Sequence, residues 1–220
     1  MRDRSIRALV LSAWFAVCLV APMLAAAQAG VVVDRVAARI ENDIITLSDI
    51  RELAAYQRLA GREPAPDSEL LRELIDQWIV ANDAAAARFP VPPEAQVDAE
   101  FTALRNQLGP PEKFAARLRE LNLSEPSVRR LVAKQMFFDA YLEHKFRAVA
   151  RVAPGDVDRY YHDEFTPQLQ RRKQPVPPLD DVRDSITELL IERDITRRAQ
   201  QWIDQARAQL DIEILPESKP

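Results

Sequence analysis

Apolar residues follow two different patterns along this chain, one typical of strands and one typical of helices. The strand-like pattern occurs in a short segment near the N-terminus. Residues 31–40 and 44–46 are rich in Val, Ile and Ala on either side of a polar turn, which is typical of a β-hairpin. Ser48 and Asp49 follow directly. A serine hydroxyl can accept hydrogen bonds from the first N–H groups of a helix, and a carboxylate suits the positive helix end. The segment therefore predicts a hairpin that leads into a helix capped by Ser48.

Most of the remaining chain has the three- and four-residue spacing of helices. Helices are expected over residues 49–59, 68–88, 93–108, 111–121, 124–148, 154–165 and 179–209, the fifth beginning at its cap Ser124. Gly61 and Gly109, together with nearby prolines, end two of them. Asp67 or Ser68 is expected to cap the second helix, and Pro154 to occupy the first position of the sixth.

Apolar faces indicate how these helices are used. The second helix places five apolar residues on one face: Leu71, Leu74, Ile75, Trp78 and Ala85. The fifth helix is apolar over more than one face between Val128 and Phe146, which is typical of a helix at the centre of a bundle. The last helix has a stripe that includes Ile186, Leu189 and Ile203.

Apolar and acidic residues alternate near the end of the chain, over residues 210–215, which is typical of a strand. A two-stranded hairpin is marginal alone, so we expect Ile212 and Ile214 to join the strand at residues 31–40. The fold class that follows is mainly α: a multi-helix bundle with a small sheet made from the N-terminal hairpin and the C-terminal strand.

The first 27 residues read as a secretory signal peptide. Three arginines within the first seven residues precede an apolar run, residues 8–24, and three alanines lead to a cleavage site near Ala27 and Gln28. The alternative is an uncleaved anchor, but 17 apolar residues are at the low edge of what spans a bilayer. We therefore expect export and cleavage.

Composition after cleavage excludes several kinds of chemistry. The single cysteine, Cys18, lies in the signal segment, so residues 28–220 contain no disulfide, thiol nucleophile or cysteine metal ligand. The segment also carries three arginines and one aspartate, so its removal changes the net charge from −4 to −6. A nucleic-acid partner is disfavoured, because such binding depends on clustered positive charge.

The order of these elements resembles the SurA-type periplasmic chaperones, whose peptide-binding body is also similar to trigger factor. The residues that carry the resemblance are VVVDRVAARIENDIITLSDIRELAAYQ at 31–57 and PPLDDVRDSITELLIERDITRRAQQWIDQARAQLDIEIL at 177–215. The family usually holds a parvulin prolyl-isomerase domain between the sixth and last helices. Only the 13 residues TPQLQRRKQPVPP, at 166–178, stand there in this chain. An autonomous domain usually needs more than about 40 residues.

The resemblance thus implies one SurA-like domain at 28–220: the hairpin and helices at 31–165, a Pro-rich connector at 166–178 in place of the insert, and a closing helix and strand at 179–215. It implies a periplasmic, ATP-independent holdase for unfolded envelope and outer-membrane proteins, without isomerase activity. Two alternatives stay open, a prolyl isomerase like the full-length relatives and a structural adaptor for one envelope partner. Open apolar faces would also allow a homodimer.

A chaperone of this kind needs accessible aromatic and methionine side chains, because these offer large and adaptable contact area. Phe137 and Tyr141 are the first candidates, since they lie on the face of the fifth helix away from Phe138. The full set of substrate-binding candidates is Phe137, Tyr141, Met136, Tyr160, Tyr161, Phe165, Tyr56 and Trp78. For any one of them alone, core packing is the commoner role.

No pattern in the sequence calls for a catalytic residue, a metal or a cofactor. His144 and His162 are the only histidines, and neither has further ligands at metal-binding spacing. The basic run Arg171-Arg172-Lys173 is expected to be a solvated loop.

Overall fold

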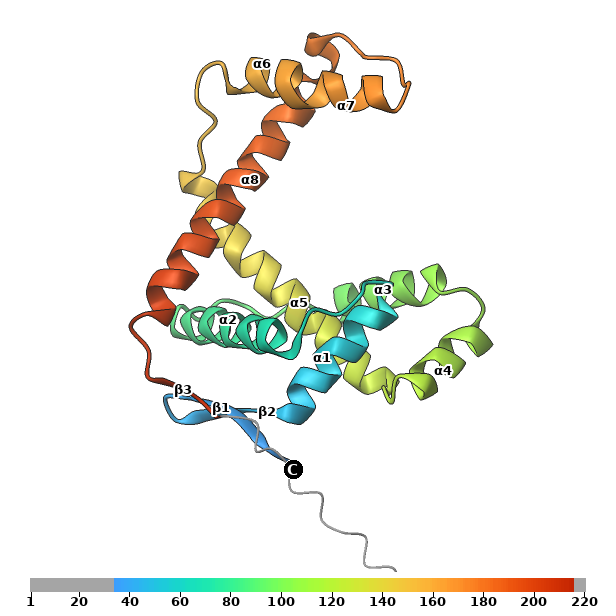
Figure 1. The fold of residues 1–220 in the computed structure, drawn as a ribbon, viewed down its shortest axis with the longest axis vertical. Helices are drawn as coiled ribbons and strands as arrows, with labels where there is room; N and C mark the ends of the chain where they lie inside the picture. The colour runs from blue at the N-terminus through green and yellow to red at the C-terminus, as the bar shows by residue number, and fades with distance from the viewer. Residues whose placement is uncertain (1–33, 216–220) are drawn as a thin grey trace, which may run out of the picture. The chain divides into compact units, whose positions relative to one another are not determined.

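The computed structural model of the chain describes residues 34–215, which are mainly helical with one small antiparallel sheet (Figure 1). The predicted signal peptide, its cleavage site and residues 31–33 of the predicted first strand lie outside the described residues.

The sheet joins the two ends of the described chain. It consists of β1 (Val36–Ile40), β2 (Asp43–Thr46) and β3 (Ile212–Ile214), in the order β2-β1-β3. Both pairings are antiparallel, and Ala38 lies opposite Ile214 while Ile40 lies opposite Ile212. The predicted closure of the sheet by the C-terminal strand is therefore confirmed. Residues 34 and 35 are not part of the strand, so β1 begins later than predicted.

The first helix, α1 (Leu47–Leu59), is capped by Thr46 and not by Ser48. The Asp49 N–H donates to the Thr46 hydroxyl oxygen at 3.2 Å, and the Thr46 N–H donates to the Asp49 carboxylate at 2.8 Å. The predicted cap was wrong because β2 runs directly into α1 without a loop. Thr46 is thus the last extended residue, and Ser48 already lies in the first turn.

We expect Thr46→Ala to lower the free energy of unfolding by about 1 kcal/mol, since it removes one half of a reciprocal capping box. Ser48→Ala is the matched control: Ser48 is exposed, and a surface change away from a cap usually stays within about 0.5 kcal/mol. Urea unfolding of both variants measures the difference. A larger loss for Ser48→Ala than for Thr46→Ala would contradict this assignment of the cap.

The second helix, α2 (Asp67–Ala86), also begins differently from the prediction. Pro66 stands at the capping position in an extended conformation and has no side-chain oxygen to offer, so Asp67 and Ser68 are helical and neither is the cap. At the other end Ala84 is buried and Ala85 is exposed, which corrects the predicted apolar face.

Three further helices follow: α3 (Glu94–Gln107), α4 (Pro111–Glu120) and α5 (Glu125–Phe146). Ser124 caps α5 as predicted, accepting from the Ser127 N–H at 3.2 Å. The helix packs against α1, α2, α3 and α8, which confirms its central position. A short 3₁₀ turn, η1 (Arg147–Val149), follows it.

The predicted sixth helix is longer than expected and starts later. Gly155 precedes it with a positive φ of 84°, and Pro154 lies outside it. The helical path runs through α6 (Asp156–Tyr160), the π-helical turn η2 (Tyr161–Phe165) and α7 (Thr166–Arg171). A π turn rearranges the helix hydrogen bonds just before Pro167, a residue that cannot donate one. Only residues 172–178 of the predicted connector are therefore non-helical.

The last helix, α8 (Leu179–Arg207), is about 44 Å long and contacts different elements along its length. It packs against α6, and Arg193 pairs with Glu164 at 3.0 Å; it also packs against α2 and α5, and Arg207 pairs with Asp76. Leu189, predicted in its apolar stripe, is exposed. Asp194 accepts hydrogen bonds from Arg198 and from the backbone N–H of Arg151, and these donors lower the pKa of its carboxyl to about 2.

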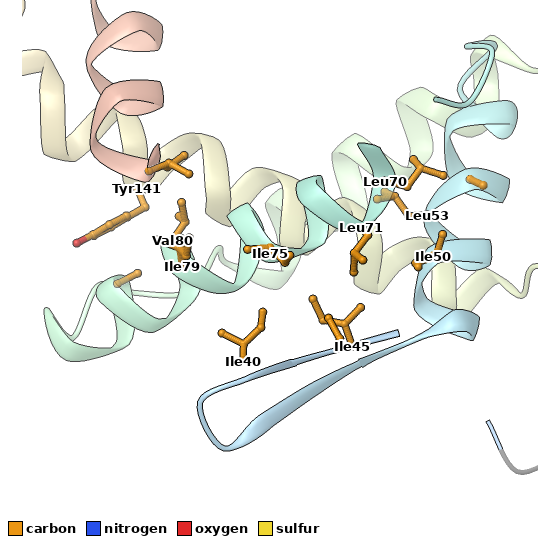
Figure 2. Packing of buried hydrophobic residues seen from close by; sticks show 14 residues of the cluster. Ile40, Ile45, Ile50, Leu53, Leu70, Leu71, Ile75, Ile79, Val80 and Tyr141 are labelled. Carbon is orange, nitrogen blue, oxygen red and sulfur yellow. The ribbon is translucent and has the colours of Figure 1, made fainter. Parts of the chain in front are cut away.

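Two clusters of buried apolar residues hold the described residues together. Figure 2 shows the sheet core, in which Ile40 and Ile45 of the hairpin lie beneath Leu71 and Ile75 of α2. The α3–α4 core is smaller and consists of Leu59, Phe101, Phe114, Leu118, Val128 and Val132. The sheet core consists of Ala38, Ile40, Ile45, Ile50, Leu53, Ala54, Leu70, Leu71, Ile75, Ile79, Val80, Ala84, Tyr141 and Ile203. Helix α5 contributes to both clusters.

Candidate binding groove

A partly open hollow of about 280 Å³ lies where β2, α2 and α5 meet, and we refer to it as the aromatic groove. Eight of its lining residues are apolar: Ile44, Ile45, Leu74, Trp78, Val80, Ala81, Phe137 and Phe138. Three are polar or charged: Asp49, Gln77 and Lys134. The groove therefore offers a mostly apolar wall with a few charges on it.

The helical walls of the groove follow from the spacing of their residues. On α2, Leu74, Trp78 and Ala81 stand four and three positions apart, which places them on one face. On α5, Lys134 stands three and four positions before Phe137 and Phe138. Each helix thus turns one continuous patch toward β2.

Strand β2 supplies the third wall through two consecutive isoleucines. Neighbouring residues of a strand point to opposite faces, so only one of the two can enter the core. Ile45 is buried in the sheet core, whereas Ile44 is 56% exposed. Ile44 therefore adds exposed apolar surface to the wall of the groove, beside the partly buried rings of Trp78, Phe137 and Phe138.

Trp78 is held in place by its polar atom. The indole Nε1–H donates to the Asp43 carboxylate at 2.9 Å, so the ring is fixed between α2 and the start of β2. With this bond made, the ring face can contact a ligand without leaving its N–H unsatisfied.

The groove gathers two of the predicted substrate-binding residues, Trp78 and Phe137, and two that the sequence reasoning missed, Ile44 and Phe138. Phe138 was expected to face away from Phe137, but both rings line the groove. The pair Ile44-Ile45 is the signal that could have identified the strand residue, since one of two adjacent apolar residues in a half-buried strand faces outward.

Tyr141, a predicted substrate contact, belongs to the sheet core instead. It is 3% exposed, and its hydroxyl donates to the Asp83 carboxylate, to which Lys145 also donates at 2.6 Å. Its ring meets that of Phe89 edge-on, with centroids 5.2 Å apart. Burial, followed by the bond to Asp83, raises the pKa of Tyr141 to about 12. The expectation of an accessible Tyr141 is therefore wrong.

Met136 and Tyr56 lie away from the groove. Both are partly buried and pack against the α3–α4 core. Burial raises the pKa of the Tyr56 hydroxyl. They are part of the packing between helices in the described structure.

The predicted aromatics of the sixth helix are less open than expected. Tyr160 is buried, with the Arg193 guanidinium 4.8 Å above its ring, which corrects its predicted exposure. Tyr161 is half-buried; its hydroxyl donates to the Pro177 carbonyl at 2.8 Å, and its ring stacks on Phe165 at 5.9 Å. The hydrogen bond anchors the connector to the helical segment, because it joins Tyr161 of η2 to Pro177, two residues before α8.

Two other kinds of site, metal centres and membrane spans, concern the described residues. No group of three or more His, Cys, Asp or Glu side chains there is placed to hold a metal ion. Over residues 34–215, none of the helices is long and apolar enough to cross a bilayer. His144 is exposed and lies against the Phe89 ring, at 5.1 Å between centroids.

Comparison with known proteins does not place the chain in a family. No protein-family model matches it, and no curated protein was found to be similar to it in sequence.

Proposed function

We propose that this protein is an ATP-independent chaperone of the periplasm that holds unfolded envelope proteins, chiefly outer-membrane proteins in transit, in its aromatic groove. The observation that carries the proposal is the groove itself, with Trp78, Phe137 and Phe138 around the exposed Ile44. The resemblance of the hairpin, helices and closing strand to the SurA-type and trigger factor peptide-binding body supports it, as does the signal-like leader.

The open form of the groove suits the side chains of a polypeptide. Sites for drug-sized molecules usually enclose about 300–1,000 Å³ and bury most of the ligand, whereas this hollow of about 280 Å³ lies at the lower end of that range and is partly open. Burying one large apolar side chain contributes about 1.5–3 kcal/mol, and ordering a flexible chain offsets much of that gain. Binding by one such groove is therefore weak and exchangeable, so that a client's own folding can release it.

The proposal includes binding without catalysis and without a cofactor. The chain has 13 residues where the family holds its isomerase domain, and six of these extend a helix in α7. A rate above background in a proline-peptide isomerisation assay would instead support the enzyme alternative.

The test is an aggregation assay with the processed protein purified from the periplasm. At stoichiometric amounts it should suppress light scattering when a denatured outer-membrane barrel protein is diluted from urea. We expect Ile44→Asp to lose at least fivefold in potency, because a carboxylate in the apolar wall must be desolvated when a client binds.

Ile214→Asp is the matched control. Ile214 is an exposed isoleucine of the opposite edge strand, at 63% exposure, and it does not line the aromatic groove. Its variant should suppress aggregation as the unchanged protein does. The proposal fails if the unchanged protein gives no suppression, or if the two variants lose potency equally.

A further inference from the structure

The hydrogen bonds of the sheet show which backbone groups of β1 are used on each side. The Glu41 N–H donates to the Asp211 carbonyl at 3.0 Å, and the Leu215 N–H donates to the Ala37 carbonyl at 2.9 Å. Strand residues bond alternately to the left and the right neighbour. Ala37, Arg39 and Glu41 therefore bond toward β3, and the residues between them bond toward β2.

This alternation leaves the backbone of Ile44 free. Ile44 lies opposite Arg39, whose own N–H and C=O point to β3, so the N–H and C=O of Ile44 point away from β1. Across residues 34–215, no other backbone or side-chain group is bonded to them. The next outward N–H on β2, that of Thr46, is already bonded to Asp49.

The free edge and the aromatic groove meet at the same residue. Ile44 lines the groove and is half exposed, so a chain that pairs with its backbone would lie along the groove wall. Added strands obtain affinity from main-chain hydrogen bonds and specificity from pockets for alternate side chains.

We propose that the groove takes its client as an extended strand, which pairs with the backbone N–H and C=O of Ile44 and directs every second side chain into the aromatic groove. This inference rests on the proposed function and deepens it, since it specifies the backbone conformation and sequence pattern of the client.

Charges on the groove refine the pattern. Asp49 is bonded to Thr46 in the capping box, whereas Lys134 is exposed and forms no ion pair with any carboxylate of the described residues. Lys134 is thus the charged side chain on the wall that is held by no intramolecular ion pair in the described residues, and its ammonium complements a client carboxylate. The preferred segment has apolar residues at alternate positions and an acidic residue between them. Lipid-facing strands of membrane β-barrels have this apolar–polar alternation.

The probe for the test is a fluorescently labelled nonapeptide in which Phe and Leu alternate with Ser and Glu, and its binding is followed by anisotropy. Ile44→Pro removes the free N–H without removing a bond to β1, and a proline is tolerated where an edge N–H faces solvent. Ile44→Val keeps the N–H with a similar side chain. We expect Ile44→Pro to weaken binding about five- to tenfold and Ile44→Val less than twofold.

A second measurement uses the unchanged protein and does not depend on the folding of the proline variant. Two forms of the peptide carry N-methyl groups on alternate amides, one on each phase of the strand. A one-residue slip would turn the apolar side chains out of the groove, so the register phase is fixed. One methylated form should bind about five- to tenfold more weakly and the other within twofold of the parent peptide.

The outcomes separate this inference from the proposed function. Equal binding of both methylated forms, or a failure of the parent peptide to bind while aggregation is still suppressed, overturns strand pairing and leaves the chaperone proposal standing. Stronger binding of a helical peptide of the same composition assigns the groove to a helix, and a dimer that Ile44→Asp dissociates assigns it to a second copy; each overturns the inference. Absence of both peptide binding and aggregation suppression overturns both proposals.

Discussion

Replacing Phe114 by alanine is expected to lower the free energy of unfolding by about 3–5 kcal/mol and to release α4 from the fold. Phe114 is 1% exposed, and its ring meets that of Phe101 edge-on with centroids 5.7 Å apart. Helix α4 has ten residues, of which only Phe114 and Leu118 are buried. A helix this short is marginal in water, so it depends on these two contacts.

Urea unfolding measures the overall loss, and hydrogen exchange at α4 amides measures the local release. Lys113→Ala is the control on the same helix, because Lys113 is exposed and its replacement should change stability by less than about 0.5 kcal/mol. Unchanged amide protection in α4, with a loss below about 1 kcal/mol for Phe114→Ala, would mean that the α3–α4 core is not what holds this helix.

The α3–α4 core also shows which features of the fold can be predicted from the spacing of apolar residues. The four-residue spacing of Phe114 and Leu118 is enough to predict that they share one face of their helix, and alternation at the chain end was enough to place Ile212 beside β1. Both predictions rest on local periodicity and on the need of a short sheet for a further strand. Helix faces and short strands can therefore be predicted from residues that are close together in the sequence.

Helix starts were less predictable, because a cap is defined by the last extended residue and not by residue type alone. Thr46 became the cap because β2 continues up to it, although Ser48 has an equally suitable hydroxyl. Pro66 and Gly155 stand before α2 and α6 with no side-chain cap at all. Tertiary contacts determine which residue is the last extended one before a helix. The spacing of apolar residues in the sequence gives no information about those contacts.

The groove was only half predicted for a related reason. Periodicity identified aromatic residues on α5 but could not tell which of their faces would stay uncovered. Phe137 lines the groove together with Leu74 and Trp78 of α2, while Tyr141, one turn later, is buried and bonded to Asp83. Exposure of Ile44 arises from its place on an edge strand, which requires the strand order to be known.

Replacing Tyr141 should also lower the free energy of unfolding strongly. Substitution by alanine and by phenylalanine separates the contribution of packing from that of the hydrogen bond. Tyr141→Ala should lower the free energy of unfolding by about 3–5 kcal/mol, because it leaves a cavity in the sheet core beside Phe89. Tyr141→Phe keeps the ring and loses only the hydrogen bond to Asp83, so a loss of about 1–2 kcal/mol is expected. Urea unfolding at pH 7 measures both values.

The loss of unfolding free energy in Tyr141→Phe should depend on pH. Burial pushes the pKa of Asp83 upward, but hydrogen bonds from Lys145 and Tyr141 outweigh it and hold the pKa below its ordinary value. A carboxyl whose pKa is depressed by folding adds stability above its unfolded pKa, near 3.9, and this stability is lost as the pH falls through the folded value. The difference in unfolding free energy between Tyr141→Phe and the unchanged protein should therefore be largest at pH 7 and should shrink below about pH 4.

A difference in unfolding free energy that stays constant down to pH 3 would show that the hydroxyl stabilises the core by a route other than the ionised Asp83. Reduced aggregation suppression by folded Tyr141→Phe at pH 7 would restore Tyr141 as a client contact.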